Sequence, residues 1–206
     1  ILIGCEFSGI VRDAFIARGH DAMSCDLLPT ERPGPHYQGD VRDILGDGWD
    51  LMIAHPPCTY LSTVANGHHA RFYSERQPKR EAAAKFFMLL YTCPIPRVAI
   101  ENPVSVMSTL FRRPDQIVHP YYFGDPEHKR ICLWLRELPL LSHDGPNHAK
   151  PAPSYYTPRG EAKYFTYKKS RSPVERSRFF PGIAAAMADQ WGAASGEATP
   201  GGKGTA

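Results

Sequence analysis

A cysteine and a glutamate stand directly after two apolar runs, and their side chains are suited to covalent catalysis. Cys58 follows "WDLMIAHPP", and Glu101 follows "RVAI". A thiolate is a good nucleophile where it is partly exposed and its pKa is depressed. A carboxyl group that keeps a proton in an enclosed pocket can donate it to a ring nitrogen while the ring is attacked. Together the two residues predict nucleophilic attack on a heteroaromatic ring, whereas Cys58 alone is equally typical of a small buried side chain.

Three features earlier in the chain are typical of a nucleoside-binding site. Gly9 in "EFSG" allows a tight turn and a close approach of the backbone to a ligand. Asp26 follows about 20 residues later, where an acid commonly binds ribose hydroxyls. Asp40 in "GDVRDI" can accept a hydrogen bond from an adenine amino group. Each feature is weak alone, because "EFSG" lacks the full glycine pattern of a dinucleotide loop and Asp26 can equally cap a helix or form a turn.

The positions of these residues indicate a sheet that gathers them at one edge. They follow short apolar runs rich in β-branched residues, which are typical of buried strands. Prolines close two of these runs, since proline cannot continue a central strand. We expect strands within 1–6, 20–29, 36–45, 49–57, 96–103 and, around a turn at 124–126, within 116–135. We expect helices within 7–19, 75–92 and 181–192.

Alternating strands and helices predict the fold class, which is α/β with a mostly parallel, Rossmann-like sheet and helices on both faces. In such sheets, ligands bind beyond the carboxyl ends of the strands, where the residues named above would lie. The predicted organisation is a catalytic core at 1–136, a Pro-rich and basic insert at 137–176, a closing helix at 177–192 that returns to the core, and a disordered tail at 193–206.

Composition excludes several other classes of protein. The 206 residues carry a net charge of +3, which permits nucleic-acid binding without requiring it. The five cysteines are widely spaced, which argues against a disulfide framework and a structural zinc site and fits a reducing cytoplasm. His68 and His69 have no carboxylate or cysteine at ligand spacing, so we expect no metal. No signal peptide and no apolar run long enough for a membrane span are visible.

A basic segment with interleaved aromatic residues lies near the end of the chain. Such a segment suits phosphates and stacked bases, although a solvated surface loop explains it equally well. Its cations are Arg159, Lys163, Lys168, Lys169, Arg171, Arg176 and Arg178, and its aromatic residues are Tyr164, Phe165 and Tyr167.

Taken in order, these motifs resemble those of the DNA cytosine-C5 methyltransferases, in particular short, phage-encoded members. "GCEFSG" is similar to the cofactor loop of that family, "GDVRDI" to its G-D-[IV] motif and "HPPCTYLS" to its P-C motif. "IENP" is similar to its E-N-V motif, and "FGDPEHKRICLWL" to a segment that leads to two arginines. Three departures stand out: Pro103 replaces the valine, the arginine pair is shortened, and the region of the target-recognition domain is brief.

The resemblance implies the S-adenosylmethionine-dependent methyltransferase fold and a role for each matching residue. Cys58 would attack C6 of cytosine, while Glu101 would hydrogen-bond or protonate N3. Arg130 matches the second arginine and would contact the O2 side and hold Glu101, and the first arginine would fall on His128 or Lys129. Asn102 and Pro57 would shape the pocket. The cofactor, S-adenosylmethionine or a close analogue, would be bound by Phe7, Ser8, Gly9, Asp26, Asp40 and Val41.

The implied partner is DNA, either single-stranded or a duplex with the target base flipped out, because C5 is hidden in the stack. The residues expected to contact it are Tyr60, His68, Arg71, Lys129, Lys168, Lys169 and Arg171. A phage-type enzyme would act in the cytoplasm of a bacterial host.

Two alternatives remain open at this point. The same chemistry can act on a cytidine nucleotide, or use a modified cofactor that transfers another one-carbon or carboxymethyl-type group. A non-catalytic nucleic-acid-binding relative is the second alternative, although the presence of Cys58, Glu101, Asp26 and Arg130 argues against it.

Overall fold

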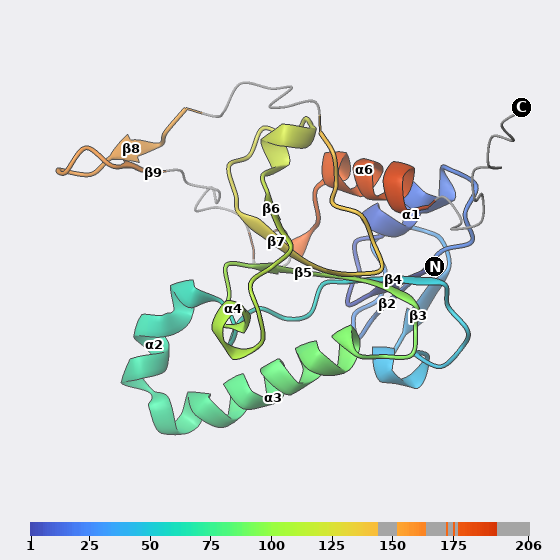
Figure 1. Ribbon diagram of the computed structural model, residues 1–206, viewed down its shortest axis with the longest axis horizontal. Helices are drawn as coiled ribbons and strands as arrows, with labels where there is room; N and C mark the ends of the chain where they lie inside the picture. Colours follow the sequence, from blue (N-terminus) through green and yellow to red (C-terminus); the bar gives the residue numbers. More distant parts are fainter. Residues whose placement is uncertain (144–151, 164–171, 173–174, 176, 193–206) are drawn as a thin grey trace, which may run out of the picture.

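The computed structural model describes residues 1–143, 152–163, 172, 175 and 177–192, and its main feature is a seven-stranded sheet (Figure 1). The spatial order of the strands is β3-β2-β1-β4-β5-β7-β6. The bounds of these strands are β1 Leu2–Gly4, β2 Met23–Asp26, β3 His36–Gln38, β4 Leu51–Ala54, β5 Arg97–Pro103, β6 Gln116–Val118 and β7 Ile131–Arg136.

The sheet is parallel from β3 through β5, and only β7 runs against its neighbours β5 and β6. This confirms the predicted Rossmann-like fold. The chain places β2 and β3 on one side of β1 and then crosses over to place β4 on the other side. Such a reversal of direction opens a crevice at the carboxyl ends of the strands, which is where open α/β sheets bind their ligands.

Helices cover both faces of the sheet, as predicted. The helix α1 (Ile10–Ile16) packs with α6 (Pro181–Trp191) on one face, and α3 (Tyr73–Tyr91) lies on the other (Figure 1). Phe15 and Trp191 are buried on the first face. On the second face Phe87 meets Trp134 edge to face at 5.2 Å, which is a favourable geometry for aromatic pairs. Side chains alternate between the two faces along each strand, so the sheet contributes to two separate apolar cores.

Shorter elements connect these layers. The first predicted helix begins only at Ile10, because Gly9 takes the left-handed conformation with φ of 71°. A proline, Pro78, lies inside α3. The short elements are η1 (Val41–Asp43), η2 (Thr63–Ala65), α2 (Asn66–Arg71), α4 (Met107–Leu110) and η3 (Pro120–Phe123).

Part of the predicted Pro-rich and basic insert at 137–176 forms regular structure that the sequence did not indicate. The strands β8 (Tyr155–Tyr156) and β9 (Ala162–Lys163) pair antiparallel and form a hairpin that projects from the body of the molecule (Figure 1). The turn between them uses Gly160 at φ of 77°, a conformation that glycine adopts without strain. The predicted tail at 193–206 lies outside the described residues.

Candidate active site

Most of the predicted site residues stand at or just beyond the carboxyl ends of parallel strands. Gly4 pairs in register with Cys25 and with Ala54, and Ala54 pairs with Ile100. The residues that follow these positions therefore emerge at one edge of the sheet. They are Cys5, Asp26, His55 and Glu101.

The proposed nucleophile, Cys58, begins a tight turn just beyond β4. Its carbonyl oxygen accepts hydrogen bonds from the backbone N–H groups of Leu61 (3.0 Å) and Ser62 (2.8 Å), and its side chain is partly exposed. Burial raises the pKa of the Cys58 thiol, the negative charge of Glu101 raises it further, and Lys129 opposes both. Cys58 is therefore a thiol in the free protein, so the structure departs from the depressed pKa that favours a nucleophilic cysteine.

Glu101 is buried and makes its side-chain contact with a residue that the sequence reasoning missed. Its Oε2 lies 3.2 Å from Nδ1 of His55. Burial acts to raise the pKa of Glu101, but the His55 hydrogen bond and the charges of Lys129 and His55 bring it below its ordinary value. His55 thus stabilises the carboxylate in this structure, and the proton transfer to a ring nitrogen expected of Glu101 stays a prediction.

The cation next to this pair also differs from the expected one. The charge of Lys129 acts on both Cys58 and Glu101, whereas Arg130 is exposed and its charge acts on Cys132. Lys129 Nζ lies 5.4 Å from the centroid of the Phe180 ring. In the described part of the chain the side-chain hydrogen bond of Glu101 is with His55, and the role expected of Arg130 stays a prediction.

A hydrogen bond from the side chain of Asn102 stabilises the turn that carries Cys58. Its Nδ2 donates to the carbonyl oxygen of Pro56 at 2.9 Å, and the side chain is buried. Pro57 is exposed and lines a cavity at the ends of the first strands. These positions agree with the expected part of Asn102 and Pro57 in shaping the pocket.

A cavity of about 250 Å³ lies beside the turn, and it contains three of the predicted cofactor residues. Its walls are mostly apolar, and the carboxyl groups of Asp26 and Asp40 line it, a combination typical of small-ligand sites. Phe7, Ser8 and Gly9 are outside this lining. The lining residues are Cys5, Cys25, Asp26, Leu27, Gly39, Asp40, Val41, Arg42, Pro57 and Phe86.

The two carboxylates of the cavity each have a partner within the protein. Asp26 Oδ1 accepts from the backbone N–H of Leu28 at 2.9 Å, which is the turn-forming role that the sequence left open. Asp40 accepts from the Nε and the backbone N–H of Arg42. The side-chain hydrogen bond from Arg42 lowers the pKa of Asp40 to about 2. A carboxylate has two oxygens with several lone pairs, so both groups keep lone pairs for a ligand.

The loop after β1 contains a second residue that the sequence reasoning passed over. Glu6 Oε1 accepts hydrogen bonds from Ser8 Oγ and from the backbone N–H of Ile10 (2.8 Å). Its other oxygen, Oε2, is buried and has no hydrogen-bond partner among the described residues. A Cβ at Gly9 would lie 2.6 Å from an Arg12 nitrogen, so this position requires glycine. The signals for Glu6 and His55 were their places inside "CEFSG" and "AHPPC".

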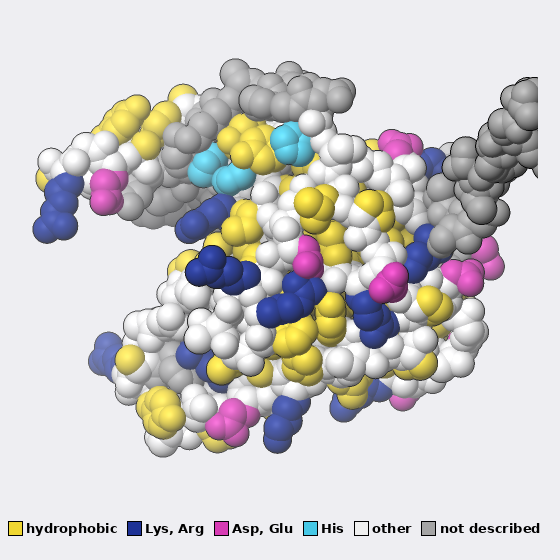
Figure 2. Space-filling model, in the orientation of Figure 1, with side chains coloured by type: hydrophobic (Ala, Val, Ile, Leu, Met, Phe, Trp, Pro, Cys, Tyr) yellow, Lys and Arg dark blue, Asp and Glu magenta, His cyan; other side chains and the backbone are white. Residues whose placement is uncertain are grey.

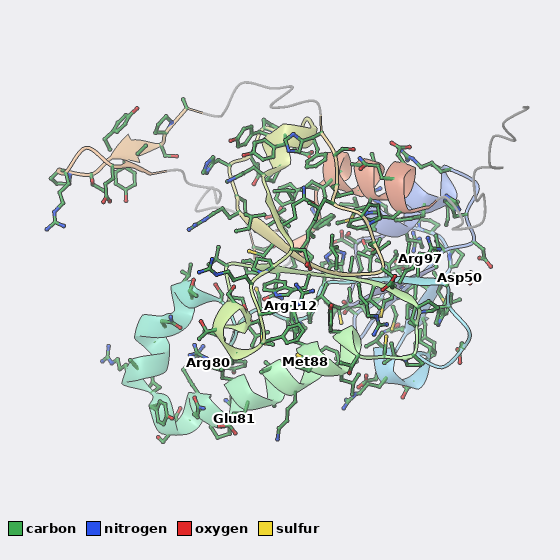
Figure 3. All side chains as sticks on the ribbon, viewed as in Figure 1. Asp50, Arg80, Glu81, Met88, Arg97 and Arg112 are labelled. Carbon is green, nitrogen blue, oxygen red and sulfur yellow. The ribbon has the colours of Figure 1, made fainter. Side chains whose placement is uncertain are left out.

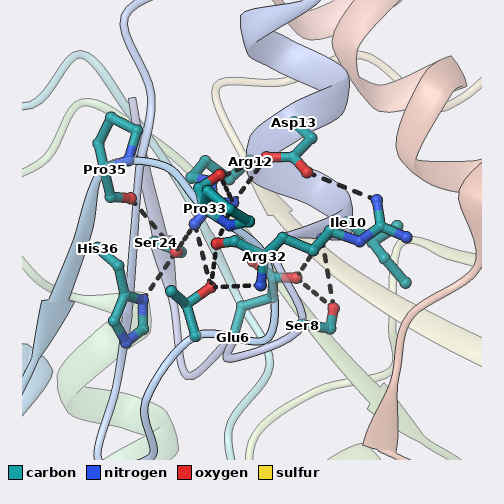
Figure 4. A network of polar contacts seen from close by, with 11 residues as sticks. Glu6, Ser8, Ile10, Arg12, Asp13, Ser24, Arg32, Pro33, Pro35 and His36 are labelled. Carbon is teal, nitrogen blue, oxygen red and sulfur yellow. Dashed lines mark hydrogen bonds and ion pairs between the residues drawn. The ribbon is translucent and has the colours of Figure 1, made fainter.

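A buried arginine holds the loop that follows β2 (Figure 4). Arg12 in α1 is fully buried, and its guanidinium donates to Ser24 Oγ at 3.1 Å and to Thr30 Oγ1 at 3.2 Å. It also donates to the carbonyl oxygens of Arg32 (3.1 Å) and Pro33 (3.2 Å). Because this loop begins at Asp26 and Leu27, Arg12 fixes one wall of the cavity.

The residues expected to contact DNA fall into three groups. Tyr60 packs its ring under Arg76 at 4.7 Å. Its carbonyl oxygen accepts from Nε of Arg80 at 2.9 Å, and Arg80 is labelled near α3 in Figure 3. His68 and Arg71 are exposed on α2 and lie against Phe72. Lys168, Lys169 and Arg171 lie outside the described residues.

Lys and Arg side chains gather along the middle of the face shown in Figure 2. Within the part of the chain that the structure describes, no cluster of three or more His, Cys, Asp or Glu can hold a metal ion. All five cysteines are free. None of the described helices combines the length and the apolar character that a membrane span requires.

Comparison with known proteins gives distant structural likenesses. The sequence matches no protein-family model and no curated protein. The fold is similar to the crystal structure of a candidate DNA modification methyltransferase encoded within an E. coli prophage, with 16% identity and a TM-score of 0.42. The match covers 74% of this chain and 52% of that one, so the chain spans about half the length of that protein.

Proposed function

We propose that this protein transfers a methyl group from S-adenosylmethionine to C5 of cytosine in DNA, through a covalent bond between Cys58 and C6. One observation supports this most: Cys58 and Glu101 share a sheet edge with a nucleoside-sized cavity, and Pro57 belongs to both the cavity wall and the nucleophile turn. Neither residue alone specifies the reaction. Their combination beside a cavity that would hold adenosine supports it, because a nucleophile, a proton carrier and a methyl donor would then lie together.

The chemistry follows from the electronic structure of the base. C5 of cytosine is a poor nucleophile, and addition of the Cys58 thiolate to C6 moves electron density onto C5. S-adenosylmethionine would supply an electrophilic methyl group: C5 would bond to it as the bond from sulfur to methyl breaks, and S-adenosylhomocysteine would leave. Loss of the C5 proton to solvent and expulsion of Cys58 then restore the ring. Covalent catalysis of this kind divides one difficult step into easier ones.

Glu101 would assist by binding N3 of the base. A proton on the outer carboxylate oxygen, held against N3, draws electrons from C6 and favours attack by sulfur. The same proton removes the negative charge that raises the pKa of the Cys58 thiol. Burial still raises that pKa, and the charge of Lys129, which favours the thiolate, would then have burial alone to oppose. Binding of the base and activation of the nucleophile are therefore linked.

The residues of the cavity suit the cofactor. Asp26 and Asp40 can accept from the ribose hydroxyls and the adenine amino group, and Val41 and Phe86 provide apolar contacts. Glu6 Oε2 is buried without a partner among the described residues, and such an atom is costly unless a ligand satisfies it. A cationic ligand such as the amino-acid end of S-adenosylmethionine would do so. The proposed fit of the cofactor thus rests on the hydrogen-bonding groups that these residues offer.

DNA is the proposed substrate because cations and aromatic side chains surround the nucleophile turn. Arg71 and Phe72 in the α2–α3 corner are exposed, and Lys129 lies close to the reacting pair. Flipping a base out of a duplex costs a few kcal/mol, and such contacts can offset it. A cytidine nucleotide needs no flipping and is the competing substrate.

The proposal is tested by incubating the protein with tritiated S-adenosylmethionine and duplex DNA, single-stranded DNA or dCMP. We expect label in DNA, and 5-methylcytosine as the product in nucleoside mass spectrometry. DNA containing 5-fluorocytosine should form a stable adduct with the Cys58 peptide, because fluorine cannot leave as the proton does. Cys58→Ser should form no adduct, whereas Cys93→Ser, which alters a buried cysteine, should retain it.

The outcomes separate the alternatives. Label in dCMP alone would identify a nucleotide-modifying enzyme. Methylation of adenine or of an exocyclic amino group would contradict the C5 chemistry. DNA binding without label or adduct would identify a non-catalytic relative.

A further inference from the structure

Three cations on one side of α3 lie against the turn that follows Cys58, and the proposed reaction gives them no role. The guanidinium carbon of Arg76 lies 4.7 Å and Nζ of Lys79 lies 5.8 Å from the centroid of the Tyr60 ring. Arg80, one helical turn after Arg76, donates from Nε to the carbonyl oxygen of Tyr60 at 2.9 Å. The three side chains therefore converge on a residue two positions after the nucleophile.

The two arginines hold this turn through neutral oxygens. Nη2 of Arg76 donates to the carbonyl oxygen of Thr59 at 3.2 Å, and Nη2 of Arg80 donates to Oδ1 of Asn66 at 3.0 Å. In the described part of the chain, no carboxylate forms an ion pair with Arg76, Lys79 or Arg80. These hydrogen bonds fix the backbone of the turn, but they leave the positive charges without a counter-ion.

An arginine elsewhere in the structure shows what these side chains lack. Arg112 forms an ion pair with Asp115, with 2.8 Å between nitrogen and oxygen. The acid next to Arg80 along the chain is Glu81, but Figure 3 shows Glu81 on the opposite side of α3. Its Oε1 accepts from Nε2 of Gln77 at 2.9 Å. Positive charge therefore accumulates on the side of α3 that contacts the nucleophile turn.

The two guanidinium groups are close enough to repel each other. Burial lowers the pKa of Arg80, and the positive charge of Arg76 lowers it further. Nε of Arg76 is buried without a hydrogen-bond partner, and among the described residues Nη1 of each arginine also has none. An anion between the two groups would offset the repulsion and supply missing acceptors.

A phosphate group is the anion that suits this arrangement. A guanidinium fork binds phosphate oxygens bidentately, and a fork stacked on an aromatic ring, as that of Arg76 is on Tyr60, keeps its orientation. Lys79 adds a third positive charge at the same ring. Two residues of chain span at most about 7 Å, so a phosphate held at this turn would lie next to the nucleotide whose base meets Cys58.

We propose that Arg76 and Arg80 form a clamp for the backbone phosphate next to the target nucleotide, with Lys79 as an outer charge. The inference rests on the proposed function for the nature of the target, whereas the clamp itself requires only a phosphodiester strand. Because the same two arginines hold the backbone that follows Cys58, a phosphate bound there has a fixed position relative to the sulfur.

The clamp can be measured by DNA binding alone, without any methyl transfer. The readout is the dissociation constant of a short fluorescent duplex, measured by anisotropy at several KCl concentrations. Each phosphate contact contributes about 0.9 to the slope of the logarithm of affinity against the logarithm of salt concentration. In the double variant Arg76→Gln and Arg80→Gln, we expect a slope shallower by about 0.9 and weaker binding, most of all at low salt.

Further variants separate charge from a loss of structure. The double variant Arg76→Lys and Arg80→Lys keeps both charges and should retain the wild-type slope. Lys85→Gln removes an exposed charge further along the same helix, and its slope should also stay unchanged. Urea denaturation reports whether each variant is folded. The single variant Arg80→Gln, whose amide can still donate to a carbonyl oxygen, covers the case in which the double glutamine variant does not fold, and its slope should also fall.

The clamp would be disproved by an unchanged slope in the glutamine variants, or by an equal loss of slope in Lys85→Gln. An equal loss in the double lysine variant would show that the arginines only hold the turn. A wild-type protein that binds no DNA would also disprove the clamp. Weaker binding of dCMP in calorimetry, with DNA binding unchanged, would assign the site to the phosphate of a free nucleotide instead.

The same measurements distinguish the clamp from the proposed function. A protein that shows the loss of slope but transfers no methyl group would disprove the proposed function alone. A protein that methylates DNA, and whose glutamine variants keep the wild-type slope, would disprove the clamp alone.

Discussion

The buried guanidinium of Arg12 allows a direct test of how the cavity wall is held. Replacing Arg12 with Met keeps the apolar part of the side chain and removes every donor. The lost hydrogen bonds are those to the hydroxyls of Ser24 and Thr30 and to the carbonyl oxygens of Arg32 and Pro33. Each acceptor then depends on water, although the site is enclosed by α1 and the loop after β2.

The magnitude follows from the burial of each partner. Arg12 is 0% exposed, whereas Asp13, its ion-pair partner, is 35% exposed and can be rehydrated, so the ion pair itself contributes little. Hydrogen bonds to a charged group are worth about 1.5–3 kcal/mol each, but they are not additive when they share one donor group. Removing one partner from a buried charged network costs about 3–5 kcal/mol. We expect the free energy of unfolding of Arg12→Met to fall by that amount.

Urea denaturation at neutral pH measures this loss, and Arg18→Met is the matched control. Arg18 pairs with Asp189, and these side chains are 29% and 60% exposed, so the control should lose less than about 1 kcal/mol. Calorimetry should show weaker cofactor binding only for Arg12→Met, because Asp26 and Leu27 begin the loop that Arg12 holds. Equal and small losses in the two variants would refute the argument that Arg12 secures the cavity wall.

Four further predictions test the roles of the site residues. Cys58→Ser should abolish methyl transfer. Calorimetry should give a cofactor dissociation constant within about twofold of the wild-type value, because the thiol does not line the cavity. A loss of cofactor binding would contradict the role of Cys58 as nucleophile. Asp26→Ala should raise that constant about tenfold, or about 1.4 kcal/mol, and an unchanged value would remove the ribose assignment. Glu101→Gln should lower kcat by about 10²–10⁴ in single-turnover assays, since an amide cannot pass a proton to N3. The pKa of Asp40 is about 2, below the ordinary 3.8, so its contribution to stability is present above the ordinary value and lost as the pH falls through about 2. Denaturation of Asp40→Asn should therefore approach that of the wild type as the pH falls through this range, and a constant difference would argue against the Arg42 hydrogen bond as its cause.

Much of the fold could be predicted because the strands are short apolar runs that end in recognisable residues. Pro56 and Pro57 end one run, and Pro103 ends another, so the edge that carries Cys58 and Glu101 was visible in the sequence. Parallel strands place such residues at one edge without further information. The short hairpin of β8 and β9 was not visible, because two-residue strands carry almost no periodic pattern.

The side-chain contacts of the site could not be predicted in the same way. His55 and Glu101 are 46 positions apart, and their contact depends on the register between β4 and β5. The distinction between Lys129 and Arg130 depends on which of two adjacent side chains faces the pair, and a motif comparison cannot resolve one position. Glu6 was overlooked because its unsatisfied oxygen is a property of burial rather than of residue type.

The surroundings of Cys58 explain why the nucleophile can lie beside a carboxylate. A permanent thiolate on a partly exposed turn would be open to oxidation, since thiolate character and exposure determine that susceptibility. Burial and the charge of Glu101 both raise the pKa of the thiol, so they protect the sulfur while the site is empty. Lys129 opposes both effects, and its charge is the one that would favour the thiolate when a substrate is bound.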